Sequence, residues 1–505
     1  MNRNFMLEQL ANIQEWDIVI IGGGATGLGA AVDAASRGYK TLLVEQYDFS
    51  KGTSSRSTKL VHGGVRYLAQ GNIKLVREAL RERGRLLKNA PHLSSVQPFI
   101  VPVFSWWEKC YYALGLFVYD ILSGKLSLGK TQVLSKKQTC AHLPAINPAG
   151  LSGGVLYFDG QFDDSRLSTD LAVTASIHGA VLLNYCRASG FTKKRGRING
   201  VELTDTLSHK TYSVSAKSVI NATGVFTDSV MQMEDAEKHA IVSPSQGIHL
   251  VVPALFFPGK DAMMIPKTED GRVLFAVPWH EKVVLGTTDT PIDLPSIEPK
   301  PLEEEIQFIL KHINQYCSSQ IKRSDVLSVY VGLRPLVKTN GSKSTALLSR
   351  DHTLLISTGG LVTITGGKWT TYRKMAEDAV DNAVFIGKLD KKFCVTRELP
   401  IGHPRNRKLA LDRLVNLDPS LADYVYPGYT YIKAEIVYAV RNEMAMTVED
   451  VLARRTRLLF LDANAAMQSA KEVARIMAKE MGKDEVWQKQ QVIAFKEIAG
   501  QYLLS

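Results

Sequence analysis

The sequence predicts an α/β protein with three parts: a doubly wound sheet, a mixed or antiparallel domain inserted into it, and a helical C-terminal domain. Three observations lead to this fold class. Near the N-terminus, an apolar strand runs into a glycine-rich turn and a helix. Farther along, short apolar runs such as SVINATG and VVLGTTD alternate with helical patterns and polar strands. From about Leu389, glycines become sparse and apolar residues recur at helical spacing.

The first element has the features of a dinucleotide-binding turn. Residues 17–21 form an apolar strand, residues 22–27 read GGGATG, and residues 28–37 have a helical pattern. In such a turn, glycines allow a tight bend and a close approach of the backbone to a pyrophosphate, which lies at the helix N-terminus. A second strand ends in an acid whose carboxylate can accept hydrogen bonds from a ribose. We therefore expect a Rossmann-like site that uses Gly22, Gly24, Ala25, Thr26, Gly27 and Glu45.

Two later glycine-rich strand ends favour FAD over a nicotinamide cofactor. They are Asn221-Ala222-Thr223-Gly224 and Gly366-Gly367-Lys368. A flavin needs hydrogen-bond donors around its ring as well as a phosphate cradle. Donors at a helix N-terminus also stabilise the negative charge that grows on reduction. Each segment, taken alone, is equally compatible with an ordinary strand-to-helix turn.

The net charge, the cysteine pattern and the apolar runs indicate which partners and which cellular compartment to expect. The chain has 505 residues with 61 Lys and Arg against 50 Asp and Glu, so its net charge of +11 favours phosphorylated metabolites, acidic lipids or nucleic acid. The five cysteines form no C-x-x-C pair, so we expect reduced thiols and no metal centre. The N-terminus lacks signal-peptide features, and the longest notably apolar run, residues 110–119, is shorter than the ~20 residues of a spanning helix. We therefore expect no transmembrane anchor.

Six motifs together resemble the FAD-dependent glycerol-3-phosphate dehydrogenases, a family with bacterial respiratory and mitochondrial members. They are TSSRSTKLVHGGVRY at 53–67, QGIH at 246–249, GTTDT at 286–290, GLRPL at 332–336, SRD at 349–351 and GGKWTTY at 366–372. The sequences of these motifs, in this order, resemble those of the mitochondrial form in particular. The sequence has no D-x-D-x-D-G loop, so the calcium-binding domain of that form is not implied.

The resemblance implies oxidation of sn-glycerol 3-phosphate to dihydroxyacetone phosphate, with hydride transfer to FAD and electron transfer to a membrane quinone. A glycerol-3-phosphate oxidase that uses oxygen is the nearest alternative. A tRNA-binding flavoprotein is an alternative of another class, but the sequence shows no basic platform interleaved with aromatic residues, so we expect no nucleic-acid partner. We expect a homodimer attached peripherally to an anionic membrane surface, at the cytoplasmic face of the inner membrane.

The reaction requires a base for the hydroxyl proton and cations for the phosphate. We prefer His249 as the base, with His62 beside the flavin as second choice, because both lie next to glycines that allow a ligand to approach. The resemblance places Arg334 near the reacting oxygen, and it assigns Arg66, Tyr67, Arg350 and Lys368 to the substrate. It also implies FAD contacts from Thr53, Ser54, Ser55, Lys59, Leu60, Gly63, Gly64, Asn221, Ala222, Thr223, Gly224, Gly366, Gly367, Lys368, Trp369 and Thr370.

The expected domain boundaries follow the motifs. The FAD-dependent region spans residues 1–388, and the helical domain spans residues 389–505. Within the first region, the FAD-binding segments are about 15–90, 150–240 and 340–388, and the substrate domain is about 91–149 and 241–339. Residues 144–166 show no obvious regular pattern.

Two segments allow two interpretations each. Residues 104–128 suit either a helix at an anionic lipid surface or a buried helix of the substrate domain, because they concentrate Trp106, Trp107, Tyr111, Tyr112, Phe117 and Tyr119 near Lys109, Lys125 and Lys130. Arg454, Arg455 and Arg457 suit either a basic patch or a solvated helical face. Just before them, Thr447 and Asp450 have the spacing of a helix capping box.

Overall fold

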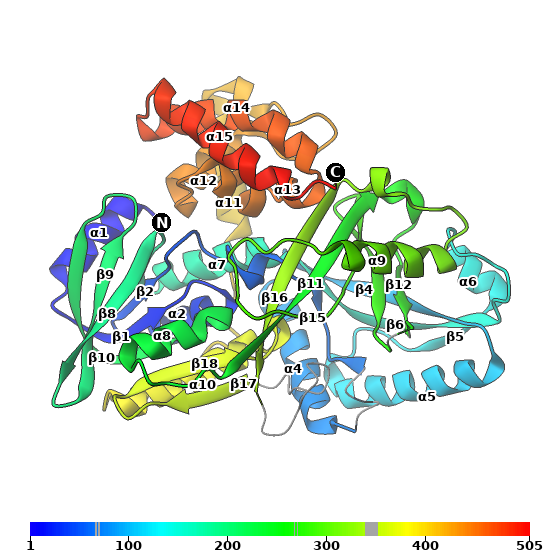
Figure 1. Cartoon of the computed structure of the whole chain (residues 1–505), viewed down its shortest axis with the longest axis horizontal. Coiled ribbons are helices and arrows are strands. Elements are labelled where there is room, and N and C mark those ends of the chain that lie inside the picture. Colours follow the sequence, from blue (N-terminus) through cyan, green and yellow to red (C-terminus); the bar gives the residue numbers. More distant parts are fainter. Residues whose placement is uncertain (66–67, 69–70, 267, 270, 339–351, 505) are drawn as a thin grey trace.

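The computed structural model describes residues 1–504 except 66–67, 69–70, 267, 270 and 339–351. Two sheets lie side by side, and the C-terminal helices cover the junction between them (Figure 1). This arrangement confirms the predicted fold class, an α/β core with an inserted mixed sheet and a helical C-terminal region.

The first sheet is the doubly wound one. Within the described residues its order is β17-β18-β10-β1-β2-β7, and the pairs from β18 to β7 are parallel. Parallel strands covered on both faces are apolar throughout, and β1 is buried almost from end to end. The strands are β1 (Glu15–Ile21), β2 (Thr41–Val44), β7 (Val181–Leu183), β10 (Thr211–Asn221), β17 (His352–Ile356) and β18 (Leu361–Gly366), with β8 (Cys186–Lys194) and β9 (Arg197–Asp205) as an antiparallel extension.

Helices from distant parts of the chain cover this sheet. Helix α2 packs against both α7 and α10, and its buried face is almost entirely alanine, glycine and leucine, which lets helices approach the strands closely. The helices of this part are α1 (Arg3–Asn12), α2 (Ala25–Ser36), α7 (Asp164–Ile177), α8 (Thr227–Glu234) and α10 (Tyr372–Ile386), with the short turns η1 (Thr53–Ser55), η3 (Gly224–Phe226) and η7 (Trp369–Thr371).

The second sheet is mixed and mostly antiparallel. In the described part of the chain its order is β15-β11-β14-β13-β12-β4-β6-β3, with β16 beside β11 and β5 beside β6. Its strands are β3 (Leu60–Val61), β4 (Ser94–Val103), β5 (Gln132–Ser135), β6 (Gly153–Phe162), β11 (Val242–Pro253), β12 (Ala262–Ile265), β13 (Leu274–Trp279), β14 (Lys282–Gly286), β15 (Thr290–Pro291) and β16 (Ser328–Val337). Around it lie α4 (Ile73–Asn89), α5 (Trp106–Ser123), α6 (Lys136–His142) and α9 (Glu303–Tyr316), and the turns η2 (Gly124–Leu126), η4 (Ala254–Phe256) and η5 (Arg323–Asp325).

One boundary differs from the expectation. The sequence shows no regular pattern in residues 144–166 and predicts that part of them belongs to the FAD-binding region. In the structure, β6 occupies residues 153–162 and pairs with β4 along its whole length. Because β6 is buried on both faces, it lacks the polar–apolar alternation that reveals a half-exposed strand.

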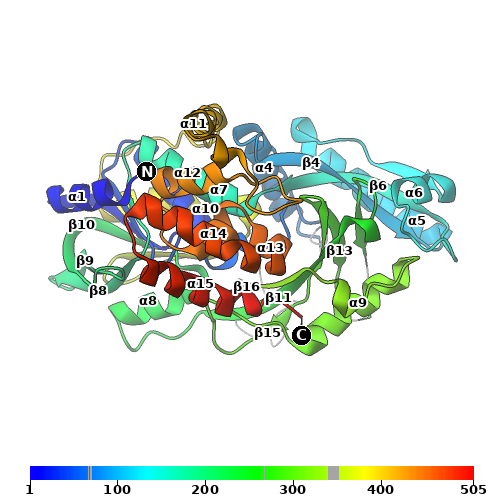
Figure 2. The ribbon, with the colours of Figure 1, turned by 90° about the horizontal axis from the view of Figure 1, so that it is seen from above.

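The C-terminal helices form a layer over both sheets, seen from above in Figure 2. They are α11 (Pro404–Leu417), α12 (Lys433–Glu443), α13 (Leu458–Leu461), α14 (Ala463–Met481) and α15 (Glu485–Gly500), with the turns η8 (Pro419–Ala422) and η9 (Asp450–Arg455), the latter a π-helical turn. The predicted capping box is confirmed, because the Asp450 amide donates to Thr447 Oγ1 at 3.2 Å and the Thr447 amide donates to Asp450 Oδ2 at 3.0 Å. Helix α13 contacts β16, so this layer rests on the inserted sheet.

Candidate active site

The first glycine-rich turn has the geometry of an anion cradle. Gly22 has φ of +110°, and a Cβ on Gly27 would lie 1.9 Å from the carbonyl oxygen of Gly22, so the turn requires glycine at both positions. Helix α2 starts directly after the turn, with Gly24 at its N-cap and no acidic residue in its first turn. The first amide, of Ala25, donates to Ser54 Oγ at 2.9 Å. The positive end of α2 is thus shaped to hold the pyrophosphate of a dinucleotide.

Glu45 closes the opposite side of the turn. Its carboxylate accepts hydrogen bonds from the amides of Gly23 at 2.7 Å and Tyr47 at 2.9 Å. Burial raises the pKa of Glu45, against the effect of these two amides. Because a carboxylate has about four lone-pair sites, it retains acceptor capacity for a ribose hydroxyl.

Hydrogen bonds join the three glycine-rich segments. The Trp369 indole nitrogen donates to the Ser54 carbonyl at 2.8 Å, and Ser54 Oγ accepts from the Ala25 amide, so Ser54 links the third segment to the first. Thr365 Oγ1 donates to the Gly224 carbonyl at 3.2 Å, which joins the third segment to the second. Gly366 and Gly367 both have positive φ, of 79° and 72°, so the chain bends sharply where these segments meet. The separate phosphate cradle and ring-side donors expected for FAD are therefore parts of one site.

His62 is held against the third segment. Its amide donates to Thr370 Oγ1 at 3.1 Å, and Thr370 Oγ1 donates to the His62 carbonyl at 3.3 Å. These bonds place the His62–Gly64 peptides beside the start of η7.

The side chain of Lys59 serves the loop itself. Its ammonium is buried and donates to both oxygens of Asp164, at 2.8 and 2.9 Å, and to the Ser55 carbonyl at 2.7 Å. The rings of Tyr330, Trp279 and Phe460 surround it at 5.1 to 5.2 Å. The ammonium therefore fixes residues 55–59 in place through bonds within the protein.

His249 sits on β11 in register with Tyr330 of β16. Its ring stacks on the Tyr330 ring with centroids 4.7 Å apart, and its Nε2 is hydrogen-bonded to Thr58 Oγ1 at 2.8 Å. Its Nδ1 is buried and has no hydrogen-bond partner in the described part of the chain. Burial lowers the pKa of His249 well below the usual value, and the charges of Lys59 and Arg334 lower it further. The imidazole is consequently neutral and able to accept a proton.

Arg334 lies on β16 opposite Ser245, four residues along the strand from Tyr330, and its side chain extends back over Gly247 toward His249. Its guanidinium donates to the carbonyls of Gln246 at 3.2 Å and Thr288 at 2.9 Å, and it lies 3.3 Å from Asp289 Oδ1. A Cβ on Gly247 would lie 2.4 Å from Arg334 Nη2, so this glycine leaves the space that the guanidinium occupies. The inserted sheet therefore brings a neutral imidazole and a fixed cation to one place.

Further contacts connect the strands that carry His249 and Arg334 with the segments near the glycine-rich turns. Thr53 Oγ1 donates to the Leu333 carbonyl at 2.8 Å, and β16 contacts β18 and η3. Of the predicted substrate residues, Lys368 lies where β18 turns into η7, whereas Arg66, Tyr67 and Arg350 lie outside the described residues. The β11–β16 pair thus contacts the loop that carries Thr53 and the strand β18, at whose end Lys368 lies.

Sequence reasoning missed three residues of this site: Thr58, Tyr330 and Asp164. Thr58 lies inside the TSSRSTK motif, so its segment was identified but its role was not. The contact of Tyr330 with His249 follows from the register of β11 and β16, which joins residues 81 positions apart and leaves no local signal.

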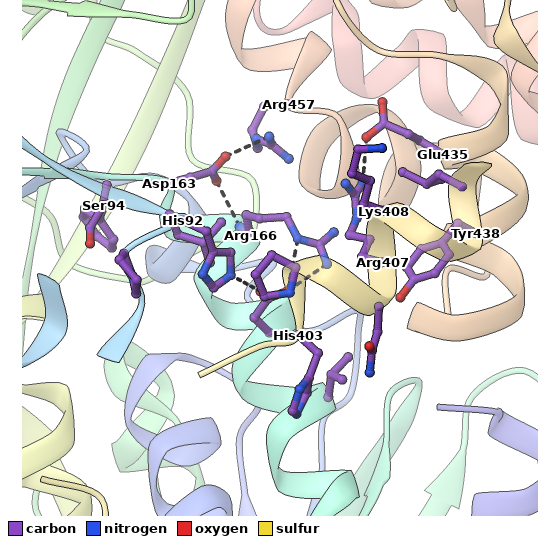
Figure 3. Close-up of a pocket in the computed structure, with 18 of the residues that line it drawn as sticks. His92, Ser94, Asp163, Arg166, His403, Arg407, Lys408, Glu435, Tyr438 and Arg457 are labelled. Carbon is purple, nitrogen blue, oxygen red and sulfur yellow. Dashed lines mark hydrogen bonds and ion pairs between the residues drawn. The ribbon is translucent and has the colours of Figure 1, made fainter. Parts of the chain in front are cut away.

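A cavity of about 880 Å³ lies elsewhere, between α7 and the C-terminal helices. Figure 3 shows Arg166, Arg407 and Tyr438 among its lining residues, and the two arginines are already paired with Glu443 and Glu435. None of its lining residues belongs to the predicted FAD or substrate set. We therefore assign the candidate active site to the glycine-rich turns and the β11–β16 pair.

Comparisons with known proteins show the family and the fold of this chain. The family model of FAD dependent oxidoreductases matches residues 17–373, and the C-terminal domain of alpha-glycerophosphate oxidase matches residues 406–490. The mitochondrial glycerol-3-phosphate dehydrogenase of Homo sapiens is 40% identical, over 97% of this chain and 74% of its own length. The mitochondrial enzyme of Arabidopsis thaliana is also 40% identical, over 95% of this chain and 85% of its own. The structure of the glycerol-3-phosphate dehydrogenase from Bacillus halodurans complexed with FAD superposes with a TM-score of 0.79 at 30% identity, covering 99% and 97% of the two chains.

Proposed function

This chain belongs to the FAD-dependent glycerol-3-phosphate dehydrogenases, and from that premise we propose that it oxidises sn-glycerol 3-phosphate to dihydroxyacetone phosphate and delivers the electrons to a membrane quinone. It is an FAD-dependent oxidoreductase. The observation that carries the proposal is the meeting of His249 and Arg334 with the three glycine-rich turns, because oxidation of a secondary alcohol by a flavin requires a base and a cation beside the ring.

Each residue of the candidate active site has a separate proposed role in this reaction. His249, held neutral by burial, takes the hydroxyl proton, and Arg334 stabilises the negative charge that develops on the same oxygen. FAD, when bound, accepts the hydride from the carbon. Lys368, together with Arg66, Tyr67 and Arg350 outside the described residues, is proposed to hold the phosphate through charged hydrogen bonds.

Helix α5 supports the proposed membrane contact. Its outer face exposes Trp107, Leu114 and Ile121 to 58%, 69% and 77%, in a row along one side of the helix. Two exposed lysines, Lys125 and Lys130, follow the helix and suit anionic headgroups. Among the described helices none has the length and apolar character to cross a bilayer. We therefore propose a peripheral enzyme on the cytoplasmic face of the membrane, in reach of a lipid-soluble quinone.

A reduction assay tests the substrate. The purified yellow protein, mixed anaerobically with sn-glycerol 3-phosphate, is expected to lose its visible flavin absorbance, whereas glycerol without the phosphate should leave it unchanged. Persistent colour with the phosphate ester would remove the substrate from the proposal.

The acceptor is tested on the reduced protein. A short-chain quinone is expected to restore the flavin absorbance much faster than air does, with little peroxide released. Rapid reoxidation in air with one peroxide per flavin would instead identify an oxidase.

A further inference from the structure

We propose that Tyr119 of α5 is a positioning residue for the oxidation reaction. Its hydroxyl group fixes the position of the Gly63 peptide, which follows His62. The inference rests on the proposed function, because it concerns residues 62–64 beside the start of η7, the flavin-side segment. The sequence predicts Tyr119 only as one aromatic residue of a membrane or core helix.

The contacts of Tyr119 are specific. Its hydroxyl accepts a hydrogen bond from the Gly63 amide at 2.7 Å and lies 2.9 and 3.1 Å from the two carboxylate oxygens of Asp159. Arg83 Nη1 in turn donates to Asp159 at 2.7 Å. The hydrogen-bonded series therefore runs from α4 through β6 and α5 to the flavin-side segment.

All three side chains of this series are buried. Burial and the Asp159 charge raise the pKa of Tyr119 well above its usual value, so its hydroxyl keeps the proton that it donates to Asp159. A hydrogen bond from a neutral phenol to a desolvated carboxylate has fixed direction and no competing water. Its acceptor site for the Gly63 amide is consequently held in one place.

The fit around Gly63 is close. A Cβ at this position would lie 2.6 Å from Tyr119 Oη and 2.5 Å from Leu80 Cδ2, so only glycine allows the peptide this near to α4 and α5. On the preceding residue, Thr370 bonds both the amide and the carbonyl of His62. Two hydroxyl groups therefore clamp successive amides of the segment between α5 and η7.

Helix α5 contributes to two functions through opposite faces. Its buried residues are Ala113, Leu116, Tyr119 and Ser123, while the face proposed to contact lipid points outwards. In Figure 1 the helix runs along the edge of the molecule opposite the C-terminal helices. The Tyr119 hydroxyl therefore couples the position of α5 to the position of the Gly63 peptide.

Tyr119→Phe tests this role because it removes the hydroxyl and keeps the ring. The Gly63 amide is then left to move toward Asp159, so the peptide beside His62 shifts. We expect the anaerobic rate of flavin reduction by sn-glycerol 3-phosphate to fall about ten-fold, since one buried donor loses its partner. KM is expected to change less than about two-fold and the FAD content to stay at the wild-type level, because the phosphate contacts and the pyrophosphate turn are elsewhere.

Two variants serve as matched comparisons. Tyr112→Phe removes the same atom from the same helix at a half-buried position away from Gly63, and it should leave the rate unchanged. Asp159→Asn keeps the Tyr119 hydroxyl but replaces both its acceptor and the counter-charge of Arg83, so in the protein that remains folded it should slow reduction in the same direction. The double variant with Tyr119→Phe should add nothing to the loss from Tyr119→Phe alone, because both act through one series of bonds.

The visible spectrum of the oxidised flavin separates this inference from the proposed substrate. A shift of the absorbance bands in Tyr119→Phe, absent in Tyr112→Phe, supports the positioning role even if another alcohol proves to be the substrate. An unchanged spectrum together with a wild-type reduction rate overturns it. So does a loss of activity that matches a loss of FAD, with the remaining flavin reduced at the wild-type rate.

Discussion

At the scale of single residues, the environment of His249 predicts an unusual pH dependence. Burial lowers its pKa first, and Lys59 and Arg334 lower it further. The neutral form is the one that accepts a proton, so a lowered pKa extends activity to more acidic solution. We expect kcat, measured with an artificial acceptor, to show no acid limb near the ordinary histidine pKa of about 6.5 and to fall only at lower pH. An acid limb in the ordinary range would contradict the assignment of His249 as the base.

A pair of substitutions distinguishes the two candidate histidines. His249→Asn is expected to lower the rate of flavin reduction about 10²- to 10⁴-fold, the usual contribution of a general base, with FAD still bound. His62→Asn should have the smaller effect, because the bonds of the His62 amide and carbonyl to Thr370 do not depend on its side chain. A larger loss from His62→Asn than from His249→Asn would reverse the assignment.

Residue types and motifs identify His249 and Arg334 from sequence, but not what surrounds them. Lys59 illustrates the limit: its motif implies a ligand contact, yet its ammonium is occupied by Asp164, which is 105 residues away. Such pairings depend on tertiary packing, and no local pattern reports them.

At the scale of elements, α5 resolves a question that its sequence leaves open. Its aromatic residues suit either a lipid surface or a core, and the structure shows both faces, with Trp107 exposed and Tyr119 fully buried. Only the register of the helix against β4 and β6 decides which residue faces which side. Composition could not supply that register.

The exposed face of α5 predicts a defined loss of membrane binding. Replacing Leu114 and Ile121 together by Asp removes two apolar side chains, each contributing ~1.5–3 kcal/mol when buried, and adds charges that anionic lipids repel. We expect binding to vesicles of anionic phospholipid, measured by sedimentation, to fall about 100-fold or more. Activity with a soluble acceptor should remain. Leu417→Asp, at an 82% exposed leucine of α11, is the control and should bind vesicles normally.

At the scale of the whole molecule, the sequence predicts the order of the parts better than their contacts. The Rossmann-like turn, the inserted sheet and the helical C-terminus follow from local periodicity and glycine spacing. Both interpretations of Arg454, Arg455 and Arg457 as exposed charges are wrong, because all three are buried. Arg454 and Arg455 both bond to Asp48, more than 400 residues earlier in the chain, and Arg457 pairs with Asp163. A helical window cannot reveal partners at that separation.

Asp48 is one point at which ion pairs join the C-terminal helical layer to the FAD-binding region. It lies in the loop that leads from β2 to η1, and its carboxylate accepts bonds from Arg455 at 2.8 and 2.9 Å and from Arg454. Asp48→Asn would leave two buried guanidinium groups short of a counter-charge. Because breaking a buried pair costs about 3–5 kcal/mol, we expect the free energy of unfolding to fall by about that amount in denaturant titrations. Lys408→Ala, which breaks the exposed pair with Asp412, should cost less than about 1 kcal/mol.

The difference in the free energy of unfolding between wild type and Asp48→Asn should also depend on pH, which provides a second test. Burial raises the pKa of Asp48, but Arg455 and Arg454 outweigh burial and hold the pKa below its usual range. The carboxylate is therefore ionised in the folded protein at a pH where it would be protonated in the unfolded chain, and its stabilisation is lost only as the pH falls. The difference in the free energy of unfolding between wild type and Asp48→Asn should stay constant from pH 8 to about 5 and become smaller below about pH 4. A difference that is already absent at neutral pH would mean that the pairs of Asp48 with Arg454 and Arg455 do not stabilise the contact between the helical layer and the FAD-binding region.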